Sequence, residues 1–197
     1  MINPLKDLAD AGQAPWLDYL HRKILGGELK ERIERDGLRG LTSNPSIFEK
    51  AIGESSDYDA SLEASLAKGD GEVIDLYEPM AIHDIQGAAD AFRPLFDSLR
   101  GADGFVSLEV SPYLARDTEG TLAEARRLWR AVDRPNLMIK VPGTREGAPA
   151  IRKLIGEGIN VNVTLLFSRE AYKAVAEAHL AGLEAQPDGV RSPSLPG

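Results

Sequence analysis

The segment LMIKVPGT, residues 137–144, places a single lysine inside a short apolar run. Residues 137–141 are long enough for a buried strand and too short for a helix, and Pro142-Gly143 ends the run. Because parallel strands are usually buried on both faces, we expect the amine of Lys140 to lie in largely apolar surroundings. Desolvation there would lower the lysine pKa, and a free amine attacks a carbonyl carbon to form a Schiff base. The alternative interpretation is a lysine at a strand end whose amine reaches solvent.

Strand and helix patterns alternate five times along the chain, after a lead-in at residues 1–14 to which no element is assigned. The expected strands cover residues 16–20, 38–42, 105–110, 137–141 and 159–167. The expected helices cover residues 28–35, most of 47–99, 118–132, 147–155 and 169–184. This rhythm predicts an α/β fold of parallel strands joined by right-handed crossovers. No glycine-rich nucleotide-binding motif follows a strand, so a (β/α)₈ barrel is the leading fold, with its site at the carboxyl ends of the strands.

The composition favours some classes of protein and excludes others. The chain has 197 residues, 43% of them hydrophobic and 27% charged, which is typical of a soluble globular protein with a real core. A net charge of −8 without a Lys/Arg stripe argues against a nucleic-acid partner. The chain has no cysteine, and its three histidines lack metal-ligand spacing, so we expect no disulfide and no metal site. With no signal-peptide pattern and no apolar run of membrane length, we expect a cytoplasmic protein without a membrane partner.

Each expected strand carries a polar residue in or just past its carboxyl half. These residues are Asp18, Asn44, Glu109, Lys140, and the pair Asn162 and Thr164. A barrel would gather such side chains around its axis. Carboxylates beside an amine supply the proton transfers of carbinolamine and enamine chemistry. The pattern therefore favours a Schiff-base role for Lys140.

Each partner of Lys140 also has a structural alternative. Asp18 could be a helix cap, and Asn44 could serve only the turn before Pro45. Glu109 could be a structural ion pair for the lysine. Asn162 and Thr164 could satisfy backbone groups inside the barrel.

The segments that hold these residues resemble the strand motifs of the transaldolase family, in the order in which that family has them. They are WLDYL, GLTSNPSIF, VSLEVSP, LMIKVPGT and EGINVNVTLLFS, and the likeness covers roughly residues 5–185. The sequences of these motifs are most similar to those of the longer bacterial transaldolases, some of which are fused to a sugar-phosphate isomerase. The resemblance implies a (β/α)₈ TIM barrel of the class I aldolase type that transfers a dihydroxyacetone unit without metal or other cofactor.

The same resemblance implies a substrate class and a role for each site residue. The donor would be sedoheptulose 7-phosphate or fructose 6-phosphate, and the acceptor glyceraldehyde 3-phosphate or erythrose 4-phosphate, in the non-oxidative pentose phosphate pathway. By this resemblance, Lys140 would be the Schiff-base lysine and Asp18 the acid/base at the donor's C4 hydroxyl. Glu109 would be the carboxylate that acts on the imine through a water molecule, and Thr164 would hold this water. Asn44 and Asn162 would bind the hydroxyls of the dihydroxyacetone unit.

The chain departs from the family pattern towards its carboxyl end. Residues 1–185 hold about five of the eight βα units, and the later family segment with a serine and arginines for the sugar phosphate has no counterpart. Residues 186–197, QPDGVRSPSLPG, have no periodicity, and we expect a disordered tail outside the family likeness. We expect a truncated or frame-shifted product, or a fragment, that is weak or inactive alone. The alternatives are a class I aldolase that releases dihydroxyacetone to water, and an inactive barrel fragment; the oligomeric state is left open.

Overall fold

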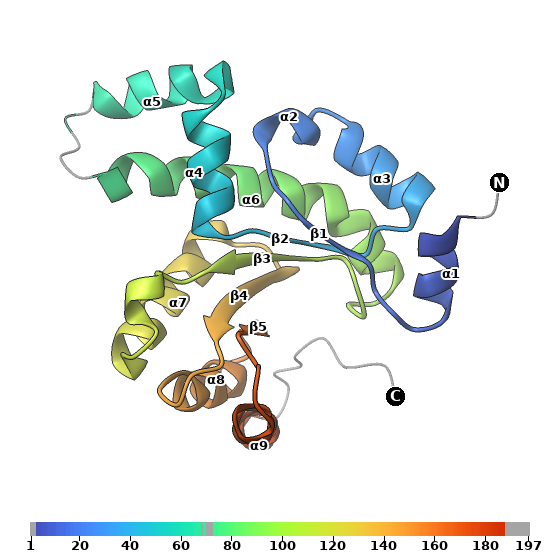
Figure 1. The fold of residues 1–197 in the computed structure, drawn as a ribbon, viewed down its shortest axis with the longest axis vertical. Coiled ribbons are helices and arrows are strands. Elements are labelled where there is room, and N and C mark those ends of the chain that lie inside the picture. The colour runs from blue at the N-terminus through green and yellow to red at the C-terminus, as the bar shows by residue number, and fades with distance from the viewer. Residues whose placement is uncertain (1–2, 68, 70–72, 188–197) are drawn as a thin grey trace. The chain divides into compact units, whose positions relative to one another are not determined.

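A computed structural model describes residues 3–67, 69 and 73–187 of the chain (Figure 1). The chain divides into two compact units, residues 1–106 and 107–197, and the boundary falls inside strand β3 (Phe105–Glu109). Each unit is described on its own.

The first unit contains two short parallel strands, β1 (Trp16–Asp18) and β2 (Gly40–Thr42). Trp16 lies opposite Gly40, and its indole ring fills the space that a Cβ at residue 40 would need. Only glycine therefore fits at the start of β2. The helices of this unit are α1 (Pro4–Asp10), α2 (Arg22–Leu25), α3 (Glu28–Asp36), α4 (Pro45–Gly53), the 3₁₀ turn η1 (Ser56–Tyr58), α5 (Asp59–Leu66) and α6 (Val73–Ser98).

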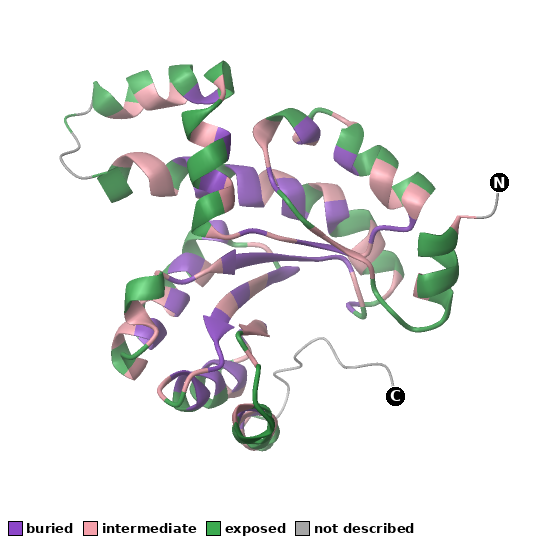
Figure 2. Ribbon diagram, in the orientation of Figure 1, coloured by how far each residue is buried: buried purple, intermediate pink, exposed green. Residues whose placement is uncertain are grey.

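Helix α6 supplies much of the core of the first unit. Ile85, Ala88, Ala89 and Phe92 are completely buried, at the spacing of one face of a helix. Figure 2 shows this buried stripe along α6, with exposed residues on its other side. The helical pattern expected for this part of the chain is confirmed.

The second unit takes its strands in chain order: β3, then β4 (Leu137–Pro142), then β5 (Val161–Thr164). Strands β4 and β5 are parallel, with Lys140 opposite Asn162 and Pro142 opposite Thr164. Helices α7 (Thr118–Val132) and α8 (Gly147–Gly156) pack against β4, and α8 also packs against β5 and α9 (Arg169–Glu184). The turn η2 (Pro112–Leu114) follows β3.

Two predicted helix starts are explained by their caps. The carboxylate of Asp117 accepts a hydrogen bond from the backbone N–H of Gly120 at 3.0 Å, and α7 begins at the next residue. The hydroxyl of Ser168 accepts one from the N–H of Ala171 at 3.0 Å, and α9 begins at Arg169. Both boundaries are confirmed.

The expectation that residues 1–14 carry no element is wrong. Pro4–Asp10 form α1, because the side chain of Asn3 accepts a hydrogen bond from the N–H of Leu5 and Pro4 occupies the first turn. The Asn-Pro pair was the signal for this helix in the sequence.

Strands β1, β2, β3 and β5 are shorter than predicted: β3 ends one residue early, at Glu109, and the other three differ for local reasons. Strand β1 ends at Asp18 because His21 already caps α2. Strand β2 starts at Gly40, since the N–H of Leu38 closes α3 on the carbonyl of Arg32. Strand β5 ends at Thr164, because the next residue, Leu165, has a left-handed φ of 62°.

The predicted fold class is confirmed: five parallel strands alternate with helices in an α/β arrangement. Among the described residues, no helix has both the length and the apolar character needed to cross a membrane. Of the expected tail, residues 188–197 lie outside the described part of the chain. Gln186 belongs to the described part, and its side-chain amide donates to the carbonyl of Ile155 at 2.7 Å.

Candidate active site

Strand β4 separates an apolar face from a face that carries the lysine. Leu137, Ile139 and Val141 are completely buried, whereas Met138 and Lys140 between them are only partly buried. Because side chains alternate along a strand, the buried residues face the packing of α7 and α8. Lys140 therefore projects from the opposite face.

The amine of Lys140 lies beside a carboxylate. Its Nζ is 3.2 Å from Oε2 of Glu109 on β3, and the two side chains are 14% and 15% exposed. A lysine that reaches solvent does not fit so low an exposure. The catalytic and the structural interpretations of Glu109 both predict this ion pair, so mutation has to separate them.

Strand β5 adds polar groups in register with β4. Asn162 lies opposite Lys140, and its amide nitrogen donates to the hydroxyl of Ser107 at 2.8 Å. Thr164 lies one alternation further, opposite Pro142. Ser107, completely buried on β3, was not singled out in the sequence. Its position two residues before Glu109 was the available signal, because residues i and i+2 of a strand share a face.

The segment after β4 is held firmly to its neighbours. The N–H of Gly143 donates to the carbonyl of Thr164 at 2.7 Å, which extends the ladder between β4 and β5. The hydroxyl of Thr144 donates to the carbonyl of Ala115 at 2.7 Å and accepts from the N–H of Gly147 at 2.9 Å. A Cβ at residue 147 would collide with the carbonyl of Pro142. The sequence PGTREG thus fixes the carboxyl end of the strand that carries Lys140.

Asp18 and Asn44 belong to the first unit. Asp18 is the last residue of β1, is exposed and lies in register with Thr42, while Asn44 follows β2 by two residues. Both are at the carboxyl ends of parallel strands, where a (β/α)₈ fold has its site. Asp18 is not a helix cap, because His21 caps the helix that follows it. Asn44 does act as a cap: its side-chain oxygen accepts from the N–H of Ile47 at 3.0 Å, so the structural role left open for it is present.

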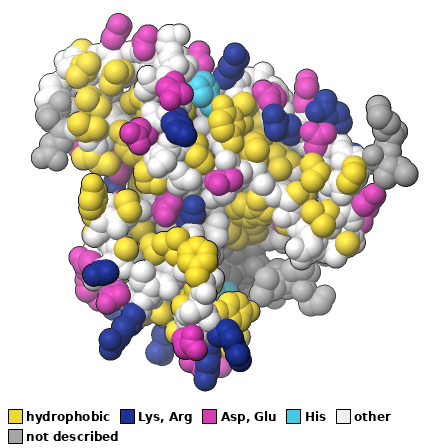
Figure 3. Space-filling view, in the orientation of Figure 1, with side chains coloured by type: hydrophobic (Ala, Val, Ile, Leu, Met, Phe, Trp, Pro, Cys, Tyr) yellow, Lys and Arg dark blue, Asp and Glu magenta, His cyan; other side chains and the backbone are white. Residues whose placement is uncertain are grey.

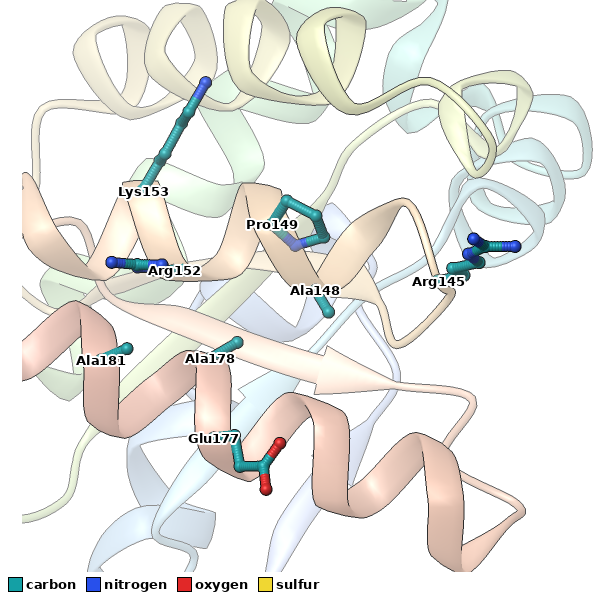
Figure 4. Close-up of a pocket in the computed structure, with 8 residues that line it drawn as sticks. All are labelled: Arg145, Ala148, Pro149, Arg152, Lys153, Glu177, Ala178 and Ala181. Carbon is teal, nitrogen blue, oxygen red and sulfur yellow. The ribbon is translucent and has the colours of Figure 1, made fainter.

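An open groove of about 740 Å³ lies elsewhere in the second unit, between α8 and α9. Figure 4 shows Ala148 on α8 and Ala178 on α9 pointing into the space between the two helices. Lys153 points away from α9, and its amine pairs with Glu119 on α7 at 3.0 Å (Figure 4). Basic side chains gather over this end of the second unit in Figure 3. None of the predicted site residues lines this groove.

A family model described as "Transaldolase/Fructose-6-phosphate aldolase" matches residues 15–193. The match includes all six predicted site residues and the first eight residues of the segment 186–197. The chain belongs to the transaldolase/fructose-6-phosphate aldolase family. This family has the TIM-barrel fold, so the five βα units described above are units of such a barrel.

Curated relatives in this family are similar over most of the chain. A transaldolase of Trichodesmium erythraeum is 50% identical over 187 residues, which are 94% of this chain and 49% of that protein. A transaldolase of Thermobifida fusca is 52% identical over 185 residues, 93% of this chain and 50% of that protein. One from Thiobacillus denitrificans is 51% identical over 183 residues, 92% of this chain and 51% of that protein. The chain spans about half the length of the curated relatives that it matches.

Proposed function

We propose that this chain carries the Schiff-base chemistry of a transaldolase. The reaction would move a dihydroxyacetone unit from sedoheptulose 7-phosphate or fructose 6-phosphate to glyceraldehyde 3-phosphate or erythrose 4-phosphate. The observation that carries the proposal is the contact of 3.2 Å between the amine of Lys140 and Glu109, within the part of the chain that matches the family. The proposal assigns the reaction to the non-oxidative pentose phosphate pathway, in the cytoplasm.

The first half of the reaction forms the imine. A lysine ammonium has to lose a proton before it can attack, and the carboxylate of Glu109 is an acceptor within reach. The free amine adds to the C2 carbonyl of the ketose and gives a carbinolamine, whose hydroxyl leaves as water after protonation. Glu109 serves this step through a water molecule held by Thr164, which lies on β5, the strand next to that of Lys140.

The second half breaks and remakes a carbon–carbon bond. Asp18 takes the proton of the C4 hydroxyl while the C3–C4 bond breaks, and the electron pair moves into the protonated imine to give an enamine. Asn44 and Asn162 bind hydroxyls of the dihydroxyacetone unit. The enamine then attacks the acceptor aldehyde, Asp18 returns its proton to the alkoxide that forms, and hydrolysis of the new imine releases the product and the free Lys140.

A second candidate is a lyase that releases dihydroxyacetone, since the family description also includes fructose-6-phosphate aldolase. In that reaction the enamine is protonated instead of attacking an aldehyde. Both activities use the imine on Lys140. Product analysis separates them, because a transferase needs an acceptor aldehyde for turnover, whereas a lyase releases dihydroxyacetone without one.

Borohydride trapping tests the proposal. We expect the full chain, incubated with fructose 6-phosphate and borohydride, to gain one reduced adduct on the peptide that contains Lys140: the whole ketose phosphate if the imine is trapped before cleavage, or a three-carbon dihydroxyacetone unit if it is trapped after cleavage. Lys140→Ala should lose this label. Lys153→Ala is the matched control, because Lys153 is 53% exposed and its amine pairs with Glu119 on α7. A label on Lys23 or Lys153 in place of Lys140 would overturn the assignment.

A further inference from the structure

A partly buried network of charged and polar side chains lies close after Asp18 in the sequence of the first unit. The guanidinium of Arg22 donates from Nε to Oδ1 of Asp84 at 3.0 Å, and the hydroxyl of Tyr58 donates to Oδ2 of the same carboxylate at 2.7 Å. Asp84 is completely buried and Tyr58 nearly so. Burial and the hydrogen bond to Asp84 raise the pKa of Tyr58, which keeps its hydroxyl protonated as a donor.

The network holds Arg22 by its backbone as well as by its side chain. The N–H of Arg22 donates to the hydroxyl oxygen of Tyr58 at 3.0 Å, and its guanidinium carbon lies 4.4 Å from the centre of the Tyr58 ring. Nη1 donates to the hydroxyl of Ser61 at 2.8 Å and to the carbonyl of Asp57 at 3.2 Å. Arg22 is therefore held by its backbone N–H, by hydrogen bonds from its guanidinium and by the Tyr58 ring.

These contacts join the segments that leave β1 and β2. Arg22 follows Asp18 by four residues, and Leu20 between them is completely buried, so the link is short and anchored. Tyr58 ends η1, which packs against α4, the helix that Asn44 caps. Through the Tyr58 hydroxyl, the chain that follows Asp18 is tied to the chain that follows Asn44.

Stability alone is a weak reason for such an arrangement. A buried ion pair often stabilises a fold no better than apolar residues of the same volume, because both charges lose their hydration. What a fully satisfied polar network does supply is a single geometry for the groups attached to it.

We propose that Arg22, Tyr58 and Asp84 are positioning residues that set Asp18 relative to Asn44 for carbon–carbon bond cleavage. This inference rests on the proposed function, in which Asp18 acts in cleavage and not in imine formation. It adds residues that touch neither the substrate nor Lys140 in that scheme. The two steps can be measured separately, which makes the role testable.

The experiment is a single turnover of fructose 6-phosphate with the full chain in excess. Imine is measured as borohydride label on Lys140, and cleavage as released glyceraldehyde 3-phosphate. We expect Tyr58→Phe to slow cleavage on the order of ten- to a hundredfold while the trapped imine stays within about twofold of wild type. Ile85→Val is the control, because it trims the core of the same helix as Asp84 without touching the network, and it should change neither step. Ser61→Ala, which removes one partner of Arg22, should show a smaller loss of the same kind and covers the case in which Tyr58→Phe does not fold.

A double variant sharpens the test. Asp18→Asn with Tyr58→Phe should cleave no more slowly than Asp18→Asn alone, since the network acts only through Asp18. Losses that multiply, or equal losses of imine and cleavage, would overturn the positioning role. Equal cleavage rates for wild type and Tyr58→Phe would overturn it too, because the network would then not set the geometry of cleavage. Absence of label on wild-type Lys140 would instead contradict the proposed function itself.

Discussion

At the scale of single residues, the reactivity proposed here depends on two opposite charges that are largely withdrawn from water. The amine of Lys140 and the carboxylate of Glu109 are each about 15% exposed or less and lie 3.2 Å apart. Removing one partner of such a pair leaves the other charge without compensation, which costs stability as well as chemistry. Substitutions at this pair therefore need two measurements, one of stability and one of the reaction rate.

Glu109→Gln separates the two roles of this carboxylate. Glutamine keeps the size of the side chain but accepts no proton, so we expect imine formation on Lys140 to slow by about 10²- to 10⁴-fold. The melting temperature should also fall, and Lys140→Met combined with Glu109→Gln should recover part of it. Rapid-quench borohydride trapping, scaled to the folded fraction from circular dichroism, measures the rate. An unchanged rate per folded molecule would mean that Glu109 is only the structural partner of the lysine.

At the scale of elements, the surface between α7 and α8 carries a charged contact whose effect depends on pH. Arg126 on α7 forms two hydrogen bonds to the carboxylate of Glu157, just after α8. This contact lowers the pKa of Glu157 below its ordinary value of 4.5. A carboxyl with a lowered pKa in the folded state stabilises the fold above its unfolded pKa, and that stabilisation is lost as the pH falls through the folded value.

Glu157→Gln should therefore lower the free energy of unfolding at pH 7 by less than about 1 kcal/mol, because the side chains are 36% and 40% exposed and solvent screens them. The difference from wild type should shrink as the pH falls below about 4.5. Urea unfolding at several pH values between neutral and acidic measures it. A difference that grows on acidification would contradict the assignment.

The elements also show how far the sequence could be read. The strand around Lys140 was predicted nearly to the residue, because an apolar run between Asn136 and Pro142-Gly143 has one sensible length. The end of β5 was not predicted to the residue. Strand β5 ends where Leu165 adopts a left-handed φ, and leucine rarely adopts this conformation, so its presence in the sequence gives no sign of it. The proximity of Lys140 and Glu109 could be predicted, because each lies near the carboxyl end of its strand and the two strands are consecutive in a parallel arrangement. The hydrogen bond between Asn162 and Ser107 depends on tertiary register, which the local pattern does not contain.

At the scale of the whole molecule, the two units are joined through one strand and each contains one tryptophan. Phe105 and Val106 of β3 belong to the first unit, and the rest of the strand belongs to the second. Trp16 is in β1 and Trp129 is in α7. Because β3 is one continuous strand with residues in both units, we expect the two units to unfold together.

Single-tryptophan variants test this expectation. In Trp129→Phe, fluorescence reports the first unit, and in Trp16→Phe it reports the second. Within each variant, the thermal transition seen by fluorescence should coincide with that seen by far-UV circular dichroism, as a two-state transition requires. A fluorescence transition that is clearly displaced from the circular dichroism transition in either variant would show that the units unfold independently.

The alternation along β4 has a practical consequence for protein engineering. Leu137, Ile139 and Val141 contribute to packing from one face, whereas Met138 projects from the face that carries Lys140. Libraries restricted to the first set should tune thermostability while leaving the proposed catalytic groups unchanged. Randomising Met138, by contrast, alters a side chain on the same face of β4 as the proposed nucleophile, and is where a search for altered ketose preference would begin.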